Sequence, residues 1–330
     1  MRNPKGKLMF THSRACVLAL GSYAVATLVY AQPYPAKPIR IIVPGGPGGG
    51  IDTVTRLISP PLAAALGQPV IPDNRPGAGT VLASELTAKA APDGYTFLAV
   101  TISHAINAGV QKNLRYDPIN DFSEVTLTAT VPNLLVVHPS VPAKSVKELI
   151  ALAKRYPGQL FFASAGSGSG THLAFELFQT MANISIVHVP YKSGTPALAD
   201  VAGGHVQLMF SNTINSGPFV KARRLRALAI TSVRRSALYP GLPTIAESGV
   251  PGYSSDAWYG VLAPARTPPD IIARLNREIV TLLKARELNE KLAAQGVDVV
   301  GSTQEEFAAW MRNEIRKWVK LTSTLKLQTD

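Results

Sequence analysis

Short apolar runs alternate with longer stretches of helical spacing along most of this chain. Residues 39–43 form an apolar run that predicts a strand, and residues 52–66 have helical spacing. Strands that alternate with helices favour parallel strand–helix–strand units. No linker rich in Ser, Gly or charge divides the 330 residues, so we expect two α/β lobes between which the chain crosses more than once. Further strands are predicted at 69–71, 95–100, 133–137, 160–163, 186–189, 206–210, 226–230 and 297–300, and helices at 79–91, 145–156, 173–181, 268–294 and 303–326.

A glycine-rich loop, PGGPGGGID from Pro44 to Asp52, follows the first predicted strand and opens the first predicted helix. Glycines let backbone N–H groups approach a ligand, and a helix start carries unpaired N–H groups and a partial positive charge. The loop therefore predicts an anion-binding cradle, with a purely structural turn as the alternative. It matches neither the nucleotide-hydrolase phosphate loop nor the dinucleotide fingerprint. We expect Asp52 to cap the helix. The expected ligand-lining residues are Gly45, Gly46, Pro47, Gly48, Gly49 and Asp52.

A second loop of the same kind, SAGSGSGTH from Ser164 to His172, also follows a predicted strand and precedes a helix. Its hydroxyl and N–H groups predict a second, uncharged anion cradle. Ser167 and Ser169 lack the flanking glycines of the hydrolase nucleophile elbow, so serine catalysis is the weaker hypothesis. His172 is expected to face solvent or the cleft. The expected ligand-lining residues are Ser164, Gly166, Ser167, Gly168 and Thr171.

No pattern of metal or cofactor binding accompanies these loops. The histidines show no HExxH motif and no i, i+4 pair on one helix, so we expect no metal and no cofactor. The basic cluster from Arg223 to Arg235 lacks interleaved aromatic residues and is interpreted as a solvated face instead of a nucleic-acid site. Asp256 lies two residues before Trp258, and either a ligand-facing acid or an exposed Asp beside a core Trp fits this spacing. Two cradles without a general acid–base pair favour a binding protein that closes two lobes on an anion.

The first 31 residues have the order of a secretory signal peptide. Four basic residues and no acid precede an apolar run of about sixteen residues, Ala15 to Tyr30, and Val29-Tyr30-Ala31 stands before Gln32. An uncleaved anchor is the alternative, but the run is shorter than the roughly 20 residues of a membrane span. Cleavage would change the net charge from +12 to 29 − 21 = +8 and remove Cys16, the single cysteine. The remaining chain would have no thiol chemistry and no disulfide.

The chain resembles the exported solute-binding proteins of tripartite tricarboxylate transporters, also called the Bordetella uptake family. The resemblance runs nearly end to end, and the order of its motifs makes it specific. The motifs are YPAKPI at 34–39, NRPGAG at 74–79, APDGYT at 91–96, SAGSG at 164–168, HVPYK at 188–192, LRALA at 225–229, LPTIAE at 242–247, WYG at 258–260 and AP at 263–264.

This resemblance implies a type II periplasmic binding protein whose two Rossmann-like lobes hold a small carboxylate between them. Lobe one would combine residues 32–134 with 255–330, lobe two would be 135–254, and 133–137 and 257–263 would be the crossing strands. The implied partners are the carboxylate and the membrane permease subunits, with a monomeric, periplasmic protein and no nucleic acid. By position, the remaining wall of the site would be lined by residues 101–104, which include Thr101, Ser103 and His104, by residues 191–195, which begin with Tyr191, and by Asn212 and Asp256.

The sequence departs from the family pattern at a few loop positions. Gly45, Gly46 and Pro47 stand where an aromatic followed by small residues is usual, which predicts a larger or looser pocket. Thr80 and Ser193 replace usual glycines. Two other functions stay open at this point: a ligand sensor for a membrane signalling partner, and a serine hydrolase using Ser167 or Ser169 with His172.

Overall fold

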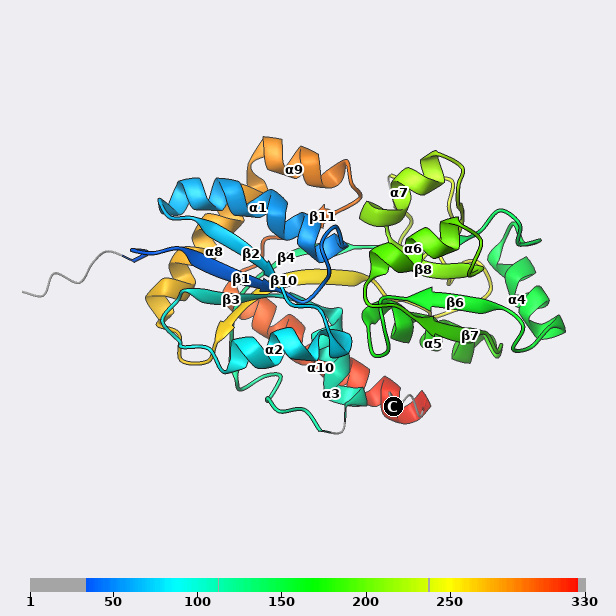
Figure 1. Cartoon of the computed structure of the whole chain (residues 1–330), viewed down its shortest axis with the longest axis horizontal. Helices are drawn as coiled ribbons and strands as arrows, with labels where there is room; N and C mark the ends of the chain where they lie inside the picture. The colour runs from blue at the N-terminus through cyan, green and yellow to red at the C-terminus, as the bar shows by residue number, and fades with distance from the viewer. Residues whose placement is uncertain (1–33, 112, 237, 326–330) are drawn as a thin grey trace, which may run out of the picture. The chain divides into compact units, whose positions relative to one another are not determined.

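The computed structural model describes residues 34–325, apart from residues 112 and 237 (Figure 1). These residues belong to one compact unit that contains two β-sheets. The predicted export segment, residues 1–31 with Cys16, lies outside the described residues. None of the helices in the described part is long and apolar enough to cross a membrane.

The first sheet, which we call sheet A, has six strands in the order β11-β4-β10-β3-β1-β2. Strands β1, β2 and β3 are parallel, whereas β10 runs antiparallel to both β3 and β4, and β11 antiparallel to β4. The central strands are almost fully buried because helices cover both faces (Figure 1). The strands are β1 (Ile39–Val43), β2 (Val70–Asn74), β3 (Thr96–Thr101), β4 (Phe122–Val131), β10 (Ala257–Pro264) and β11 (Asp298–Val299).

The second sheet, sheet B, has five strands in the order β7-β6-β8-β5-β9. Strands β6, β7 and β8 are parallel, and β5 runs antiparallel to β8 and β9. Both sheets are therefore mixed, and the prediction of parallel units holds only for part of each. The strands are β5 (Asn133–Val137), β6 (Phe161–Ser164), β7 (Val187–Pro190), β8 (Leu208–Asn212) and β9 (Arg226–Ile230).

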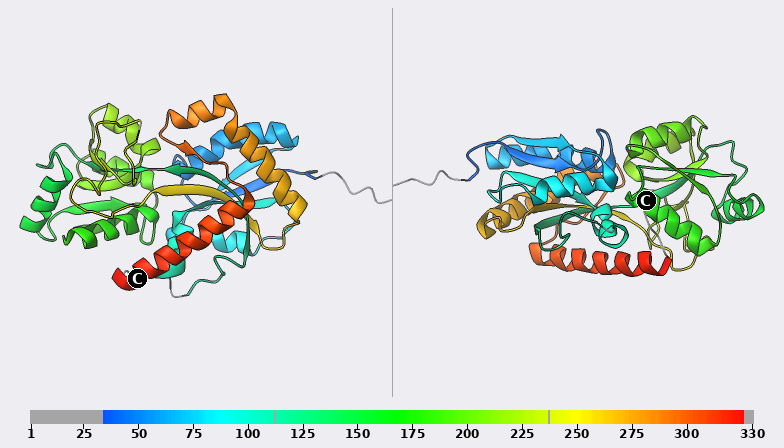
Figure 2. Two further views of the ribbon diagram at one scale, coloured as in Figure 1. Left: turned by 180° about the vertical axis from the view of Figure 1, so that it is seen from behind. Right: turned by 60° about the horizontal axis from the view of Figure 1, so that its bottom comes forward.

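The helices bury one apolar stripe each against a sheet. On sheet A, α1, α8 and α9 pack on one face and α2, α3 and α10 on the other; Figure 2 shows α10 lying along that second face. On sheet B, α4 and α5 pack on one face and α6 and α7 on the other. The helices are α1 (Gly50–Leu66), α2 (Val81–Ala88), α3 (Ile102–Val110), α4 (Val146–Arg155), α5 (Gly170–Ala182), α6 (Gly194–Ala202), α7 (Thr213–Lys221), α8 (Pro269–Lys284), α9 (Arg286–Ala293) and α10 (Gln304–Leu325), with a 3₁₀ turn η1 (Ala78–Thr80) before α2.

The chain passes from sheet A to sheet B at Pro132 and returns between β9 and β10. Hydrogen bonds tie the two passages together. The Asn133 N–H donates to Thr231 Oγ1 (2.9 Å) and the Asn133 amide donates to the Ser255 carbonyl (3.3 Å). Two connections bound in this way form a hinge that allows the two halves to move mainly toward or away from each other.

Two sequence interpretations need correction here. His172 does not face solvent: it is 8% exposed and its ring stacks on His188 with centroids 3.9 Å apart. The basic cluster is not wholly a solvated face, because the Arg226 guanidinium donates to the carbonyls of Val141 and Ala143 (3.1 and 3.0 Å). Both side chains are used to hold loops, which residue type alone did not reveal.

Candidate functional site

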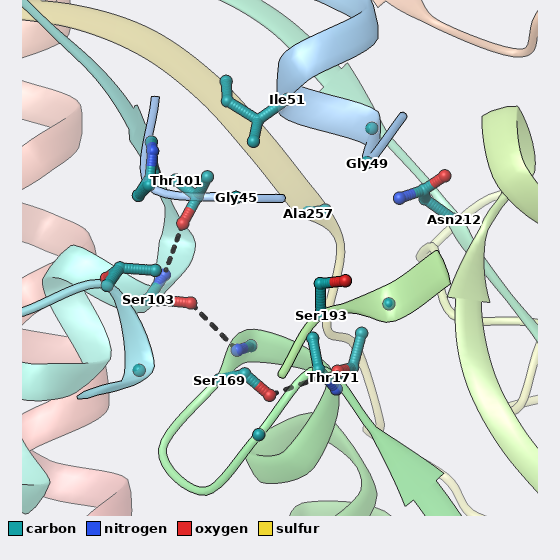
Figure 3. A pocket seen from close by; sticks show the side chains of 18 of the residues that line it. Gly45, Gly49, Ile51, Thr101, Ser103, Ser169, Thr171, Ser193, Asn212 and Ala257 are labelled. Atoms are coloured by element: carbon teal, nitrogen blue, oxygen red, sulfur yellow. Dashed lines mark hydrogen bonds between the residues drawn. The ribbon is translucent and has the colours of Figure 1, made fainter. Parts of the chain in front are cut away.

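A cavity of about 530 Å³ lies between the two sheets, at the ends of strands from both (Figure 3). Its wall is built from the loops that follow β1, β2, β3, β6, β7 and β8 and from the start of β10. Ligands of α/β proteins bind at this edge because the loops after parallel strands lead into helix starts there. The volume is in the range of pockets that enclose a small molecule.

Five helices begin at this cavity. The residues that line it include the first turns of α1, α3 and α5, the first residue of α6 and the N-cap of α7. Each helix start carries N–H groups without an intrahelical partner and a partial charge of roughly +0.5. The N-termini of these five helices all face the cavity. Their partial positive charges favour an anion there, although no helix N-terminus carries a formal charge. The residues concerned are Gly50, Ile51, Ile102, Ser103, Gly170, Thr171, Gly194 and Asn212.

The loop before α1 adopts its shape through backbone and side-chain contacts with Asp52. Gly48 has φ +75° and its N–H donates to Asp52 Oδ2 (2.9 Å), while Gly49 is the N-cap of α1. Burial would raise the pKa of Asp52, but hydrogen bonds from Arg56, Gly48 and Asn74 outweigh it and hold the pKa below its usual value. Asp52 therefore remains a buried anion that organises the loop from behind, turned away from the cavity.

The loop before α5 is held by two stacked histidines. The Gly168 N–H donates to His172 Nδ1 (3.1 Å), and Ser164 Oγ lies 2.6 Å from His188 Nε2. The Ser169 hydroxyl accepts from the His172 N–H (3.3 Å) and caps the helix. Burial lowers the pKa of His172 to about 3 and of His188 to about 4, so both rings are neutral at pH 7. The neutral His172 ring accepts from the Gly168 N–H, and the contact between His188 and Ser164 also holds the loop.

Direct contacts between the two halves close the cavity. The Gly170 N–H donates to Ser103 Oγ (2.9 Å), and the Asn215 amide donates to the Gly48 carbonyl (2.7 Å). Figure 3 shows the first of these contacts, with Ser103 on one side and Ser169 and Thr171 on the other. The close approach requires glycine at Gly79, where a Cβ would lie 2.9 Å from the Ser167 carbonyl oxygen. These contacts hold the two halves against each other at the cavity.

Charged side chains are few in this wall. Among the described residues that line the cavity, Lys192 is the only basic one and Asp256 the only acidic one. Burial raises the pKa of the Asp256 carboxyl to about 6, partly offset by the Thr231 hydroxyl, which donates to Asp256 Oδ1 (3.3 Å). The site thus presents neutral donors for the most part and one acid that titrates near neutrality. Within residues 34–325, no three His, Cys, Asp or Glu side chains gather as a metal site would require.

The structure brings most of the sequence-predicted residues to the cavity. Those that line it are Gly45, Gly46, Gly49, Thr101, Ser103, Gly166, Ser167, Thr171, Tyr191, Asn212 and Asp256. Others lie outside its lining: Pro47, Gly48, Asp52, His104, Ser164 and Gly168. His104 is fully buried against Ser84 and the Pro118 carbonyl. These six residues do not line the cavity themselves. They lie in or beside the loops whose other residues line it.

Several lining residues were not predicted from the sequence, among them Asn215 and Tyr259. Asn215 lies just after a helix start that follows a strand, which is the same signal that identified the glycine-rich loops. Tyr259 was noticed only as part of the WYG motif. Its hydroxyl reaches the start of α1 from β10, and only the fold places these segments together.

Comparison with known proteins agrees with this geometry. A family model described as "Tripartite tricarboxylate transporter family receptor" matches residues 54–327. The chain is 38% identical to BugT of Bordetella pertussis over 301 residues, which are 91% of this chain and 92% of BugT. It is 38% identical to an R. palustris protein solved with adipate (TM-score 0.86, 89% of this chain and 98% of that one). It is 30% identical to MatC from Rhodopseudomonas palustris with bound malate (TM-score 0.84, 87% and 99%).

Proposed function

The chain belongs to the tripartite tricarboxylate transporter receptor family, and from this membership we propose that it captures a small organic carboxylate in the cavity and delivers it to membrane permease subunits. The predicted family and the two-lobed fold of periplasmic binding proteins are confirmed. The family and its solved members are binding proteins and not enzymes, which also confirms the prediction of a non-catalytic chain.

The observation that supports a carboxylate ligand is the convergence of five helix starts on one closed cavity. A carboxylate can accept several N–H and O–H hydrogen bonds there, each contributing about 1.5–3 kcal/mol when one partner is charged. Four or five of them would contribute about 6–15 kcal/mol, a range that includes the roughly 8 kcal/mol of micromolar binding. Adipate and malate, the ligands of the two solved relatives, have the same chemistry.

The same proposal includes the boundaries of the two lobes and the export of the chain to the periplasm. We assign residues 32–134 and 255–330 to lobe one, around sheet A, and residues 135–254 to lobe two, around sheet B. The family is periplasmic, and residues 1–31 would act as the signal peptide that exports the chain. A monomer suffices, since both halves of the site come from one chain.

A serine hydrolase is not supported, because neither Ser167 nor Ser169 has an imidazole bonded to its side chain among the described residues.

A panel of organic acids tests the proposal. At 100 times its dissociation constant, a ligand adds about 2.7 kcal/mol to the free energy of unfolding, so a bound carboxylate should raise Tm by roughly 5 °C. Ser167→Ala removes an exposed, cavity-lining hydroxyl and should weaken binding by about 5–10-fold in isothermal titration, with Tm of the free protein unchanged. Ser140→Ala, in a turn outside the cavity, is the matched control. Absence of stabilisation by every acid at millimolar concentration would contradict the proposal.

Asp256 predicts a pH dependence of binding. The carboxyl is neutral below a pKa of about 6 and charged above it, so an anionic ligand should bind about tenfold more weakly at pH 8 than at pH 5.5. The other charged groups around it are Lys317, Glu314 and Asp298. Asp256→Asn should give an affinity that is flat over this range when measured by titration calorimetry. An unchanged pH profile in the variant would show that Asp256 does not face the ligand.

A further inference from the structure

A turn with positive φ angles lies in the cavity wall between β2 and α2. Residues 77–80, with the sequence GAGT, have φ angles of +146°, +45°, +60° and +83°, and all four line the cavity. A positive φ is uncommon outside glycine, and for a β-branched residue such as Thr80 it is an outlier. Residues in sparsely populated conformations cluster at binding sites, where the strain has a use. A glycine would adopt φ +83° freely, so the Thr80 side chain itself calls for a role.

Hydrogen bonds hold the turn in this conformation. The Thr80 N–H donates to the Gly77 carbonyl (2.9 Å), which closes the turn. Asn107 is a fully buried residue of α3, and its Nδ2 donates to the Gly79 carbonyl (2.9 Å) and to Thr80 Oγ1 (3.4 Å). The protein itself therefore sets the position of the Thr80 hydroxyl at the cavity wall.

The Thr80 hydroxyl does not serve the helix that follows it. Thr80 is the N-cap of α2, where a threonine oxygen normally accepts from an N–H of the first turn, but at φ +83° its side chain makes no such bond. The oxygen accepts from Asn107 instead, and no hydrogen bond runs from the Thr80 hydroxyl to any residue that the structure describes. Because Thr80 is half-buried and lines the cavity, its hydroxyl hydrogen is available to an acceptor there.

The turn also lies where the two halves of the molecule meet. Gly79 is so close to the serine-rich loop that an added Cβ would lie 2.9 Å from the Ser167 carbonyl oxygen. Thr80 is the next residue, so a ligand that contacts the loop before α5 comes close to its side chain. A carboxylate is best satisfied where several donors converge, as at the helix starts, whereas one uncharged hydroxyl donor suits one neutral oxygen.

We propose that Thr80 is a specificity-determining residue, whose hydroxyl donates a hydrogen bond to an oxygen substituent on the carbon chain of the bound acid. The assignment rests on the proposed function and specifies which acids bind most tightly. The helix starts hold the carboxylate, and Thr80 distinguishes an acid with a chain oxygen from the same acid without it. The fold keeps this hydroxyl in place at the expense of stability, and that exchange separates the role from simple packing.

Titration calorimetry with two pairs of acids tests this role: malate with succinate, and lactate with propionate. The members of each pair differ by one hydroxyl group. The wild type should bind the hydroxy acid of at least one pair about 5–10-fold more tightly than its partner. Thr80→Val keeps the branched shape and the backbone strain but lacks the hydroxyl, so it should abolish this preference. Thr80→Ser keeps the hydroxyl and should keep the preference.

Thr80→Gly measures what the side chain costs the fold. This variant should lose the preference and raise Tm by about 2 °C, because glycine adopts the positive φ without strain. Arg266→Gly is the matched control, since Arg266 has φ +67° and is exposed outside the cavity lining. It should raise Tm by a similar amount and leave all four affinities unchanged.

Three results would overturn the role of Thr80 and leave the proposed function intact. The first is equal affinity within both pairs in the wild type, and the second is a preference that survives in Thr80→Val. The third is a lower Tm in Thr80→Gly than in the wild type, because the side chain would then stabilise the fold. A wild type that binds none of these acids, nor any other carboxylate of the panel, would overturn the proposed function itself.

Discussion

Replacing Gly79 by alanine should lower the affinity for the ligand by about 100-fold or more while the protein still folds. Gly79 lies in η1, on the side of sheet A, and faces the loop before α5. An added Cβ would lie 2.9 Å from the Ser167 carbonyl oxygen and 3.2 Å from the Gly168 carbonyl carbon. Both neighbours are backbone atoms, which cannot rotate away as a side chain can. The clash would therefore be relieved by opening the lobes, and the open form separates the donors that must meet on the ligand.

Gly67→Ala separates this effect from backbone strain. Gly67 ends α1 with φ +71°, close to the +60° of Gly79, and a Cβ there would have no neighbour within 4 Å. Both substitutions should lower the free energy of unfolding by about 1 kcal/mol, because alanine is strained in the left-handed region. Only Gly79→Ala should lose affinity in titration calorimetry and keep the larger radius of gyration in X-ray scattering when ligand is added. Tight binding by Gly79→Ala would show that the loops can absorb the added carbon without opening.

The alternating pattern of the chain predicted most of the elements, but not how the strands pair. Residues 39–43 and 133–137 form strands as predicted, and Ser145 caps α4. The predicted helix at 79–91 begins only at Val81, after the turn η1, because Gly79 and Thr80 both have positive φ, which a right-handed α-helix does not allow. The long strand β4 was not predicted. It lies between two antiparallel neighbours that come from the last third of the chain, and local pattern carries no information about such pairing.

The glycine-rich loops identified two of the five helix starts at the cavity. The starts of α3, α6 and α7 have ordinary loop sequences, so only the folded arrangement of strands shows that they converge. Several predicted site residues turned out to support the loops from behind. Asp52 is the clearest case: it satisfies the Gly48 N–H and pairs with Arg56 and Asn74. Asn74 is 22 positions away, and that partner could not be deduced from the composition of the loop.

The second large effect is expected at acidic pH, where three histidines, the buried His104 and His172 and the half-buried His188, should make the fold unstable. Burial lowers the pKa of His104 to about 4, and the stacked pair His172 and His188 have values of about 3 and 4. In the unfolded chain these side chains have pKa values near 6.5. The unfolded state therefore binds more protons than the folded state as the pH falls from 6.5 toward 4. The contribution of the neutral histidines to the free energy of unfolding is fully present above pH 6.5 and is lost as the pH falls from 6.5 toward 4.

Each extra proton bound by the unfolded state changes the free energy of unfolding by about 1.4 kcal/mol per pH unit. Asp256 acts in the opposite direction, because its raised pKa of about 6 makes the folded state take up a proton between pH 6 and 4. Raised pKa values of Glu124, Glu176 and Asp298, all caused by burial, oppose the histidines too. The net loss should be on the order of 2 kcal/mol per pH unit below pH 6, measured by urea unfolding at pH 7.5, 6 and 5.

His104→Gln isolates one histidine, because an amide can still donate to the Pro118 carbonyl and accept from the Ser84 hydroxyl. The variant should reduce the pH dependence by up to about 1.4 kcal/mol per pH unit. A slope that is equal in wild type and His104→Gln would contradict this assignment. The same acid loss should reach the binding site, because protonation of His172 removes the acceptor that holds the Gly168 N–H. Ligand affinity should therefore fall together with stability below about pH 5, after rising between pH 8 and 5.5 as Asp256 becomes neutral.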